Sequence, residues 1–169
     1  GLTFMKMEKG LDTGPIYRQD HIEIDHEETS DSLEKKMSKV SSSKILEVID
    51  LIEENKLKLI SQNNESATYA PKISREETQI NWSMKATAIA SLINGLSPSP
   101  AAYSLLNKQR INFYLAEAVE KESLGPGKIV EVSKNKLLVG AKDFCVSIKE
   151  LSRSGKKRQK YESFYNGSK

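Results

Sequence analysis

Apolar and polar residues alternate along the first part of the chain, and this pattern predicts two short strands. Residues 2–8 alternate weakly and are rich in strand-forming side chains, and residues 16–24 alternate again. The loop between them is bracketed by Gly10 and Gly14. Because antiparallel edge strands often flank the parallel sheets of α/β enzymes, we expect a hairpin or a pair of edge strands here.

Helical periodicity follows this predicted hairpin. Apolar residues recur at three- and four-residue spacing over residues 31–60, and Ser30 or Asp31 is suited to cap the first turn. Three consecutive serines, residues 41–43, predict a break or a kink. A shorter helix is expected over residues 85–94. The segment Leu-Ser-Pro-Ser-Pro that comes next predicts a stiff, extended connector.

After residue 100 the apolar period changes to two, which is typical of strands. Five short strands are expected over residues 102–106, 111–117, 127–133, 136–140 and 144–150. Short strands at this density are typical of a small barrel. The predicted fold class is therefore α/β followed by all-β, with an OB-like β-barrel at the C-terminal end. Trp82 and Tyr69 are expected to be packing anchors for the linker rather than platforms for a ligand.

Composition limits the classes of protein and site. The single cysteine, Cys145, permits no intrachain disulfide, which fits a reducing cytoplasm, and we expect it to be a buried strand thiol. One cysteine and two histidines, His21 and His26, offer no zinc ligand set, so no metal is expected. No apolar stretch approaches the roughly 20 residues that cross a bilayer, so no membrane partner is expected. We therefore predict a cytoplasmic protein.

Charge divides the chain into two halves. Residues 1–82 carry a net charge of −5 and residues 83–169 carry +8, within a total of +3. Four cations fall within five positions near the C-terminus: Lys156, Lys157, Arg158 and Lys160. Aromatic residues follow directly, and clustered cations with aromatic neighbours suit phosphate contacts and stacking on unpaired bases. We interpret the four cations as RNA contacts; the alternative is a solvated charge run.

Asp12 is the candidate catalytic residue. A carboxylate held between two glycines in a tight loop can accept protons or orient water, and partial burial would raise its pKa toward neutrality. The alternative is an aspartate that only caps its own turn. The chain opens on Gly1 rather than Met, so we interpret it as the back part of an enzyme, from a cut piece or a split reading frame.

Four motifs at consistent spacing give the chain a family resemblance. They are residues 5–14 (MKMEKGLDTG), 68–73 (TYAPKI), 80–83 (INWS) and 125–129 (GPGKI). In this order they resemble the methionyl-tRNA formyltransferase family, from its central strands to its C-terminus. That family transfers a formyl group from 10-formyltetrahydrofolate to the amino group of methionine on initiator tRNA. It has a Rossmann-like N-terminal domain, a linker and an OB-like barrel.

The resemblance assigns roles to particular residues. Asp12 matches the family's catalytic aspartate, which orients or exchanges protons with a water or a histidine. The residues that would surround the folate pterin are Gly10, Leu11, Thr13 and Gly14. The implied domains are the C-terminal part of the catalytic domain over residues 1–66, a linker over 67–84 and an OB-like tRNA-binding domain over 85–169, with initiator methionyl-tRNA and the folate donor as partners.

The chain also departs from the family pattern. The family's catalytic Asn and His lie upstream of the aspartate and have no counterpart in these 169 residues. We therefore expect the fragment alone to be inactive, with the N-terminal catalytic half as a further partner. Ser99 stands where relatives often carry Trp. Three alternatives remain: a sugar-nucleotide formyltransferase, a glycinamide ribonucleotide formyltransferase, which lacks the barrel, and an RNA-binding relic of a split gene.

Overall fold

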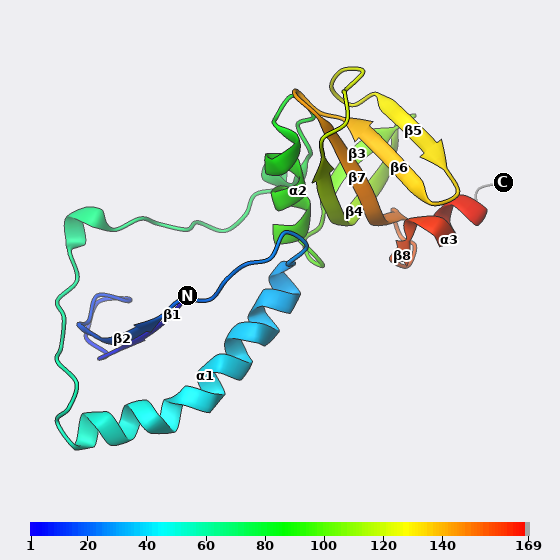
Figure 1. Ribbon diagram of the computed structural model, residues 1–169. Helices are drawn as coiled ribbons and strands as arrows, with labels where there is room; N and C mark the ends of the chain where they lie inside the picture. The colour runs from blue at the N-terminus through cyan, green and yellow to red at the C-terminus, as the bar shows by residue number, and fades with distance from the viewer. Residues whose placement is uncertain (168–169) are drawn as a thin grey trace. The chain divides into compact units, whose positions relative to one another are not determined.

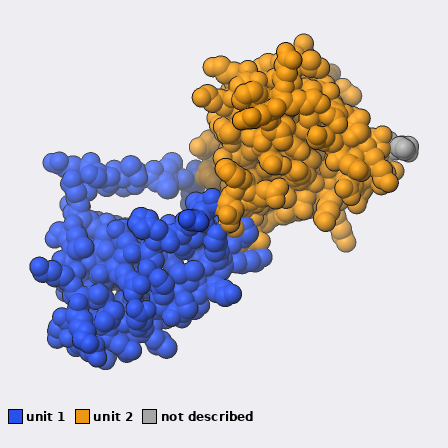
Figure 2. Space-filling model, viewed as in Figure 1, with its two compact units in different colours: residues 1–24, 32–72 blue, residues 25–31, 73–169 orange. Residues whose placement is uncertain are grey.

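The computed structural model describes residues 1–167, which fall into two compact units (Figures 1 and 2). Unit 1 comprises residues 1–24 and 32–72, and unit 2 comprises residues 25–31 and 73–169. The last two residues of the predicted C-terminal domain, 168 and 169, lie outside the described residues.

Unit 1 contains the predicted hairpin. Strand β1 (Leu2–Met5) pairs antiparallel with β2 (Ile16–Asp20), with Leu2 opposite Asp20. Both strands are shorter than the alternation predicted. Ile16 also exchanges two backbone hydrogen bonds with Ile60, at 2.8 and 2.9 Å. The segment after the helix therefore forms a one-residue antiparallel bridge with the start of β2.

Helix α1 (Ser30–Glu53) runs through the three serines without the predicted break. The Ser42 hydroxyl donates to the carbonyl of Ser38 at 2.9 Å, and the Ser43 hydroxyl donates to that of Val40 at 2.8 Å. Serine side chains that hydrogen-bond to the preceding turn are compatible with a continuous helix. The predicted break was therefore wrong.

Helix α1 also ends seven residues earlier than predicted, at Glu53 rather than at Ile60. Asn55 adopts a left-handed conformation (φ 54°), and the amide of Lys56 donates to the carbonyl of Leu51 at 2.9 Å. A left-handed asparagine with such a hydrogen bond is a common helix terminator. The released segment is then extended, which lets Ile60 reach β2.

Unit 2 is built on one antiparallel sheet. Its strands are β3 (Ala102–Leu106), β4 (Gln109–Val119), β5 (Ile129–Ser133), β6 (Lys136–Gly140), β7 (Cys145–Arg153) and β8 (Gln159–Lys160). Their order is β3-β4-β7-β6-β5, and β8 pairs with β7. All five predicted strands are present, three of them with altered ends, which confirms the period-two pattern as the signal for this half.

The sheet is not closed into a barrel. Strands β3 and β5 lie at opposite ends of the strand order and, within the described residues, do not pair with each other. The apolar space that a closed barrel would fill is instead an open cavity of about 390 Å³, which residues of both edge strands line. The predicted small OB-like β-barrel is therefore not confirmed, and the strands of the described residues form an open antiparallel sheet.

Helix α2 (Ala86–Gly95) packs on β4 and completes the core of unit 2 (Figure 1). Ile89 and Ile93 are fully buried, as helical periodicity predicted. The buried amide of Asn94 exchanges two hydrogen bonds with the backbone of Ala116, both at 2.9 Å, which joins the helix to the strand. Cys145 is buried in the same unit, as expected.

The segment between α2 and β3 is a closed turn rather than an extended connector. The amide of Leu96 donates to the carbonyl of Leu92, and the amide of Ala101 donates back to the carbonyl of Leu96 at 2.9 Å. Ser97 is fully buried within this turn, and the peptide bonds before Pro98 and Pro100 are cis. The predicted connector was wrong because these hydrogen bonds fold the segment against the end of the helix.

The remaining helices are short. They are the 3-10 turns η1 (Asn64–Ser66) and η2 (Glu76–Thr78) and the C-terminal α3 (Tyr161–Asn166). Gly167 follows helix α3 as its C-cap residue. Tyr69, expected to be a packing anchor, is 94% exposed, so that expectation was wrong.

Candidate functional site

The loop of residues 10–14 leaves β1 and enters β2, and its shape depends on a close backbone approach. The amide of Lys6 donates to the carbonyl of Pro15 at 2.9 Å, which draws the two strands together across the loop. A Cβ atom placed on the buried Gly14 would lie 1.7 Å from the carbonyl oxygen of Lys6. Only glycine fits at this position.

Gln62 holds the same loop from the other side. Its side-chain amide donates to the carbonyl of Asp12 at 2.8 Å and to the carbonyl of Gly14 at 2.7 Å. These bonds keep Asp12 in a left-handed conformation, with φ of 53°. Sequence reasoning missed Gln62, because it lies in a polar segment without periodicity, fifty residues after the aspartate.

The side chains of the loop face outward. Leu11 is 90% exposed, and Asp12 and Thr13 are exposed as well, so the partial burial considered for Asp12 is not present. Gly10 packs against Thr13, whose hydroxyl lies 2.5 Å from where a Gly10 Cβ would be. The loop thus holds the Asp12 carboxylate exposed to solvent on a hydrogen-bonded backbone.

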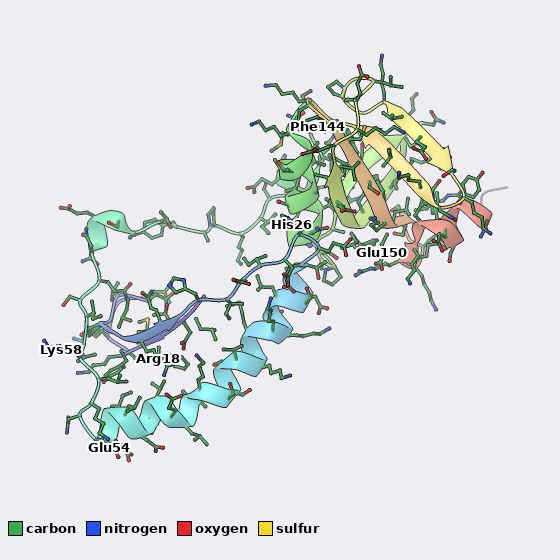
Figure 3. All side chains as sticks on the ribbon, viewed as in Figure 1. Arg18, His26, Glu54, Lys58, Phe144 and Glu150 are labelled. Atoms are coloured by element: carbon green, nitrogen blue, oxygen red, sulfur yellow. The ribbon has the colours of Figure 1, made fainter. Side chains whose placement is uncertain are left out.

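A charged cluster on β2 lies close to this loop in sequence but has a structural role. One oxygen of Asp20 accepts hydrogen bonds from Lys44 at 2.7 Å and from Arg18 at 3.2 Å, and Arg18 also pairs with Glu47 at 3.0 Å (Figure 3 labels Arg18). The Lys44 hydrogen bond, with that of Arg18, holds the pKa of Asp20 below its usual value. The cluster joins β2 to α1.

The four cations of the predicted RNA site do not share one environment. Lys156, Lys157 and Lys160 are exposed. Arg158 instead pairs with Glu150, lies 5.3 Å from the Tyr114 ring centroid and donates to the Ser97 hydroxyl at 3.5 Å (Figure 3 labels Glu150). All four cations are exposed, and Arg158 differs in that Glu150 partly neutralises its charge.

The aromatic residues that follow these cations point into the sheet. Tyr161 is buried, its hydroxyl donates to the carbonyl of Ser133 at 2.9 Å, and burial raises its pKa. Phe164 and Tyr165 line the apolar cavity, and the guanidinium of Arg153 lies 5.4 Å from the Phe164 ring centroid. In this structure these rings pack helix α3 onto the sheet.

Two of the sequence motifs meet at the wall of the cavity. Trp82 stacks edge-on against Phe113, with ring centroids 6.1 Å apart, and its indole N–H donates to the Ser104 hydroxyl at 3.0 Å. Gly127 has φ of 73°, and a Cβ atom placed on it would lie 3.4 Å from the Trp82 ring. Residues 80–83 and 125–129 thus form one packing unit, and Trp82 is a packing anchor as predicted.

The described part of the chain has neither a metal-binding cluster nor a membrane-spanning helix. Residues 1–167 contain no group of three or more His, Cys, Asp or Glu side chains placed to hold a metal ion. None of the helices described combines the length and the apolar character that crossing a membrane requires.

Two family models match the chain, one in each of its two parts. The model described as "Formyl transferase, C-terminal domain" matches residues 72–169, and the model described as "Formyl transferase" matches residues 1–49. Together these matches include the loop around Asp12 and the whole of the open sheet. The chain belongs to the formyl transferase family.

Curated relatives match nearly the full chain. Methionyl-tRNA formyltransferase of Dictyoglomus turgidum is 36% identical over 171 residues, which cover 99% of this chain and 54% of that protein. The enzyme of the same name from Desulfotalea psychrophila is 32% identical over 170 residues, covering 100% of this chain and 53% of that protein. The chain therefore spans about half the length of the curated relatives it matches.

Solved structures share the fold at low sequence identity. HypX from Aquifex aeolicus aligns with a TM-score of 0.70 and 14% identity over 96% of this chain and 30% of that chain. WlaRD, a sugar 3N-formyl transferase, aligns with a TM-score of 0.65 and 21% identity over 92% of this chain and 55% of that chain. At these identities the similarity supports the fold alone.

Proposed function

We propose that this chain is the C-terminal part of an enzyme that transfers a formyl group from 10-formyltetrahydrofolate to the amino group of methionyl-initiator tRNA, in the cytoplasm. The similarity of the whole chain to proteins named methionyl-tRNA formyltransferase, at 32–36% identity, carries this proposal. The tetrahydrofolate bound to HypX in one solved structure supports the folate part, as a property of that neighbour.

In this proposal the loop of unit 1 serves catalysis. Asp12 orients, or exchanges protons with, a water or a histidine while the amine attacks the formyl carbon. Gly10, Leu11, Thr13 and Gly14 surround the folate pterin, and the Gln62 hydrogen bonds fix the backbone that carries them. The histidine and the asparagine would come from the half of the family's length that this chain does not span.

Unit 2 provides the RNA-binding part. We propose that residues 85–169 act as an OB-like tRNA-binding domain joined by the linker 67–84 to catalytic residues 1–66. The net charge of +8 after residue 82 supports a polyanionic partner. Of the four proposed tail contacts, Lys156, Lys157 and Lys160 contribute most, and Arg158 contributes least because Glu150 pairs with it.

Binding and transfer assays on the full chain test the proposal. We expect tRNA binding that weakens steeply with salt, no binding of a UDP-sugar, and no formyl transfer by the chain alone. Formyl transfer is expected when the N-terminal half of the Dictyoglomus relative is added, and Asp12→Asn is expected to abolish it without changing tRNA affinity. Turnover by the chain alone would contradict the proposal. Binding of a UDP-sugar without binding of tRNA would also contradict it, and would favour the sugar-nucleotide alternative.

An RNA-binding relic is the second candidate. The exposed tail lysines favour it equally, because RNA binding requires no catalytic partner. The complementation assay separates the two functions: a relic binds tRNA but gains no activity from any N-terminal half, whereas an enzyme part does.

A further inference from the structure

The outer face of the sheet, opposite the core, carries an arginine stacked on a tyrosine. Ile111 and Phe113 of β4 are buried in the core, so Arg110 and Asn112, which alternate with them, lie on the outer face. The Arg110 guanidinium carbon is 3.9 Å from the Tyr103 ring centroid on β3, and the Arg110 Nε donates to the side-chain oxygen of Asn112 at 2.8 Å. Ring and amide together fix the plane of the guanidinium.

Arg110 carries an uncompensated charge. No carboxylate pairs with it among residues 1–167, in contrast to Arg158, whose partner is Glu150. Arginine presents a planar fork of donors that matches a phosphate in a bidentate geometry, and its weak hydration favours such contacts. A guanidinium already held flat loses little further freedom when it binds. Arg158, which lies over Tyr114 and pairs with Glu150, therefore has a structural role. Arg110, which lies over Tyr103, is available to a ligand.

Two turns that carry lysines lie next to the start of β4, where Arg110 is. The amide of Ser154 donates to the carbonyl of Arg110 at 3.1 Å, which places the turn after β7 beside the start of β4. Lys156 and Lys157 follow in that turn, and the exposed Lys108 lies in the turn between β3 and β4. We call these four residues, Lys108, Arg110, Lys156 and Lys157, the basic end of the sheet.

We propose that the basic end contacts the sugar–phosphate backbone of RNA, with Arg110 as its anchoring cation and Tyr103 as the residue that positions Arg110. This inference rests on the proposed RNA-binding function and adds Lys108, Arg110 and Tyr103 to the tail lysines. A stacked guanidinium favours RNA over an acidic protein surface, because its open face can also stack on an unpaired base.

Salt-dependent binding of initiator tRNA to the full chain tests the cations. Arg110→Gln and Lys108→Gln are each expected to lower affinity about eightfold at about 0.1 M salt and to reduce the slope of log K against log salt by about one. Lys142→Gln is the matched control. Lys142 lies in the turn before β7, at the other end of that nine-residue strand, and loses the same charge. We expect the tRNA affinity of the Lys142→Gln variant, and the slope of its log K against log salt, to match those of the wild type.

Tyr103 variants test the positioning role. Tyr103→Leu removes the ring and is expected to weaken tRNA binding. Tyr103→Phe keeps the ring and is expected to bind tRNA as the wild type does. The melting temperature of each variant shows whether it is folded. Recovery by Phe but not by Leu distinguishes stacking from the Tyr103 hydroxyl, which donates to Gln79 at 3.2 Å.

The outcomes separate this inference from the function on which it rests. If Lys156→Gln and Lys157→Gln weaken tRNA binding while Arg110→Gln and Lys108→Gln do not, the inference is overturned and the proposed function stands. If the wild-type chain binds no tRNA at low salt, both are overturned. If polyglutamate competes for the basic end as well as tRNA does, the RNA assignment is overturned.

Discussion

At the scale of single residues, the loop around Asp12 shows how a glycine and a distant amide position one carboxylate. Gly14 permits the backbone approach to Lys6, and Gln62 holds the two carbonyls that flank Thr13. Gln62 is not proposed to touch substrate, and the close approach at Gly14 involves backbone alone. The geometry of the loop therefore depends on positions that a search for catalytic side chains would pass over.

Gly14→Ala is expected to disorder this loop. The added Cβ meets backbone at 1.7 Å, which a side-chain movement cannot relieve, so we expect a loss of about 2–4 kcal/mol in the stability of unit 1. Hydrogen exchange of residues 1–20 measures it. Gly95→Ala is the control, because no atom lies within 4 Å of its added Cβ. Unchanged exchange in Gly14→Ala would show that the close approach is not required.

At the scale of elements, α2 depends on a cap supplied from far along the chain. One oxygen of Asp143 accepts the amides of Ala86, at 2.9 Å, and of Phe144, at 2.8 Å. These bonds, led by that of Ala86, lower the pKa of Asp143 from its ordinary value. The first turn of the helix is thus satisfied by the turn between β6 and β7, fifty-seven residues later.

This cap makes the stability of unit 2 depend on pH. Because the folded pKa of Asp143 is depressed, its contribution is present above the unfolded pKa and is lost as the pH falls through the folded value. We expect Asp143→Asn to lower the melting temperature at about pH 7 and to reduce its fall between about pH 5 and about pH 2. Glu120→Gln, an exposed carboxylate of the same unit, serves as control. A melting curve for Asp143→Asn that follows the wild type at every pH would contradict the role.

Sequence patterns predicted the elements better than their ends or their partners. The period-two strands of unit 2 and the apolar face of α2 follow from local alternation, which the chain carries in itself. The end of α1 depends instead on Asn55 adopting a left-handed conformation, and its continuity depends on where the Ser42 and Ser43 hydroxyls donate. Such choices among local hydrogen bonds leave no periodic signal.

Some residues of the candidate sites could likewise be predicted from sequence patterns, and others could not. The glycine-bracketed loop and the family motifs pointed to Asp12, and the cluster of cations pointed to the tail lysines; both roles remain proposals. Gln62, Tyr103 and Arg110 act through contacts with residues distant in sequence or on a neighbouring strand, so nothing in their own neighbourhood marked them. Local alternation also could not decide whether the predicted barrel closes, since closure depends on whether β3 and β5 meet.

At the scale of the whole molecule, the two units differ in how much apolar surface they bury. Unit 2 has a contiguous core between α2 and the sheet. In unit 1 the one fully buried apolar residue within the described chain is Val48, while Leu46 is 71% exposed on the same helix. Unit 2 therefore has the stronger basis for independent stability.

The free edge of β5 carries a consequence for handling the protein at high concentration. Among residues 1–167 β5 pairs only with β6, and Ile129 and Val132 on it are about half exposed. A strand with unpaired amides and apolar side chains is a template for a strand from another molecule. We expect light scattering to show self-association that Val132→Lys suppresses and Leu46→Lys, a control that removes exposed apolar surface from a helix, does not. Equal suppression by both would indicate general stickiness, whereas suppression by Val132→Lys alone would identify the open edge as the origin of aggregation and as the place to engineer solubility.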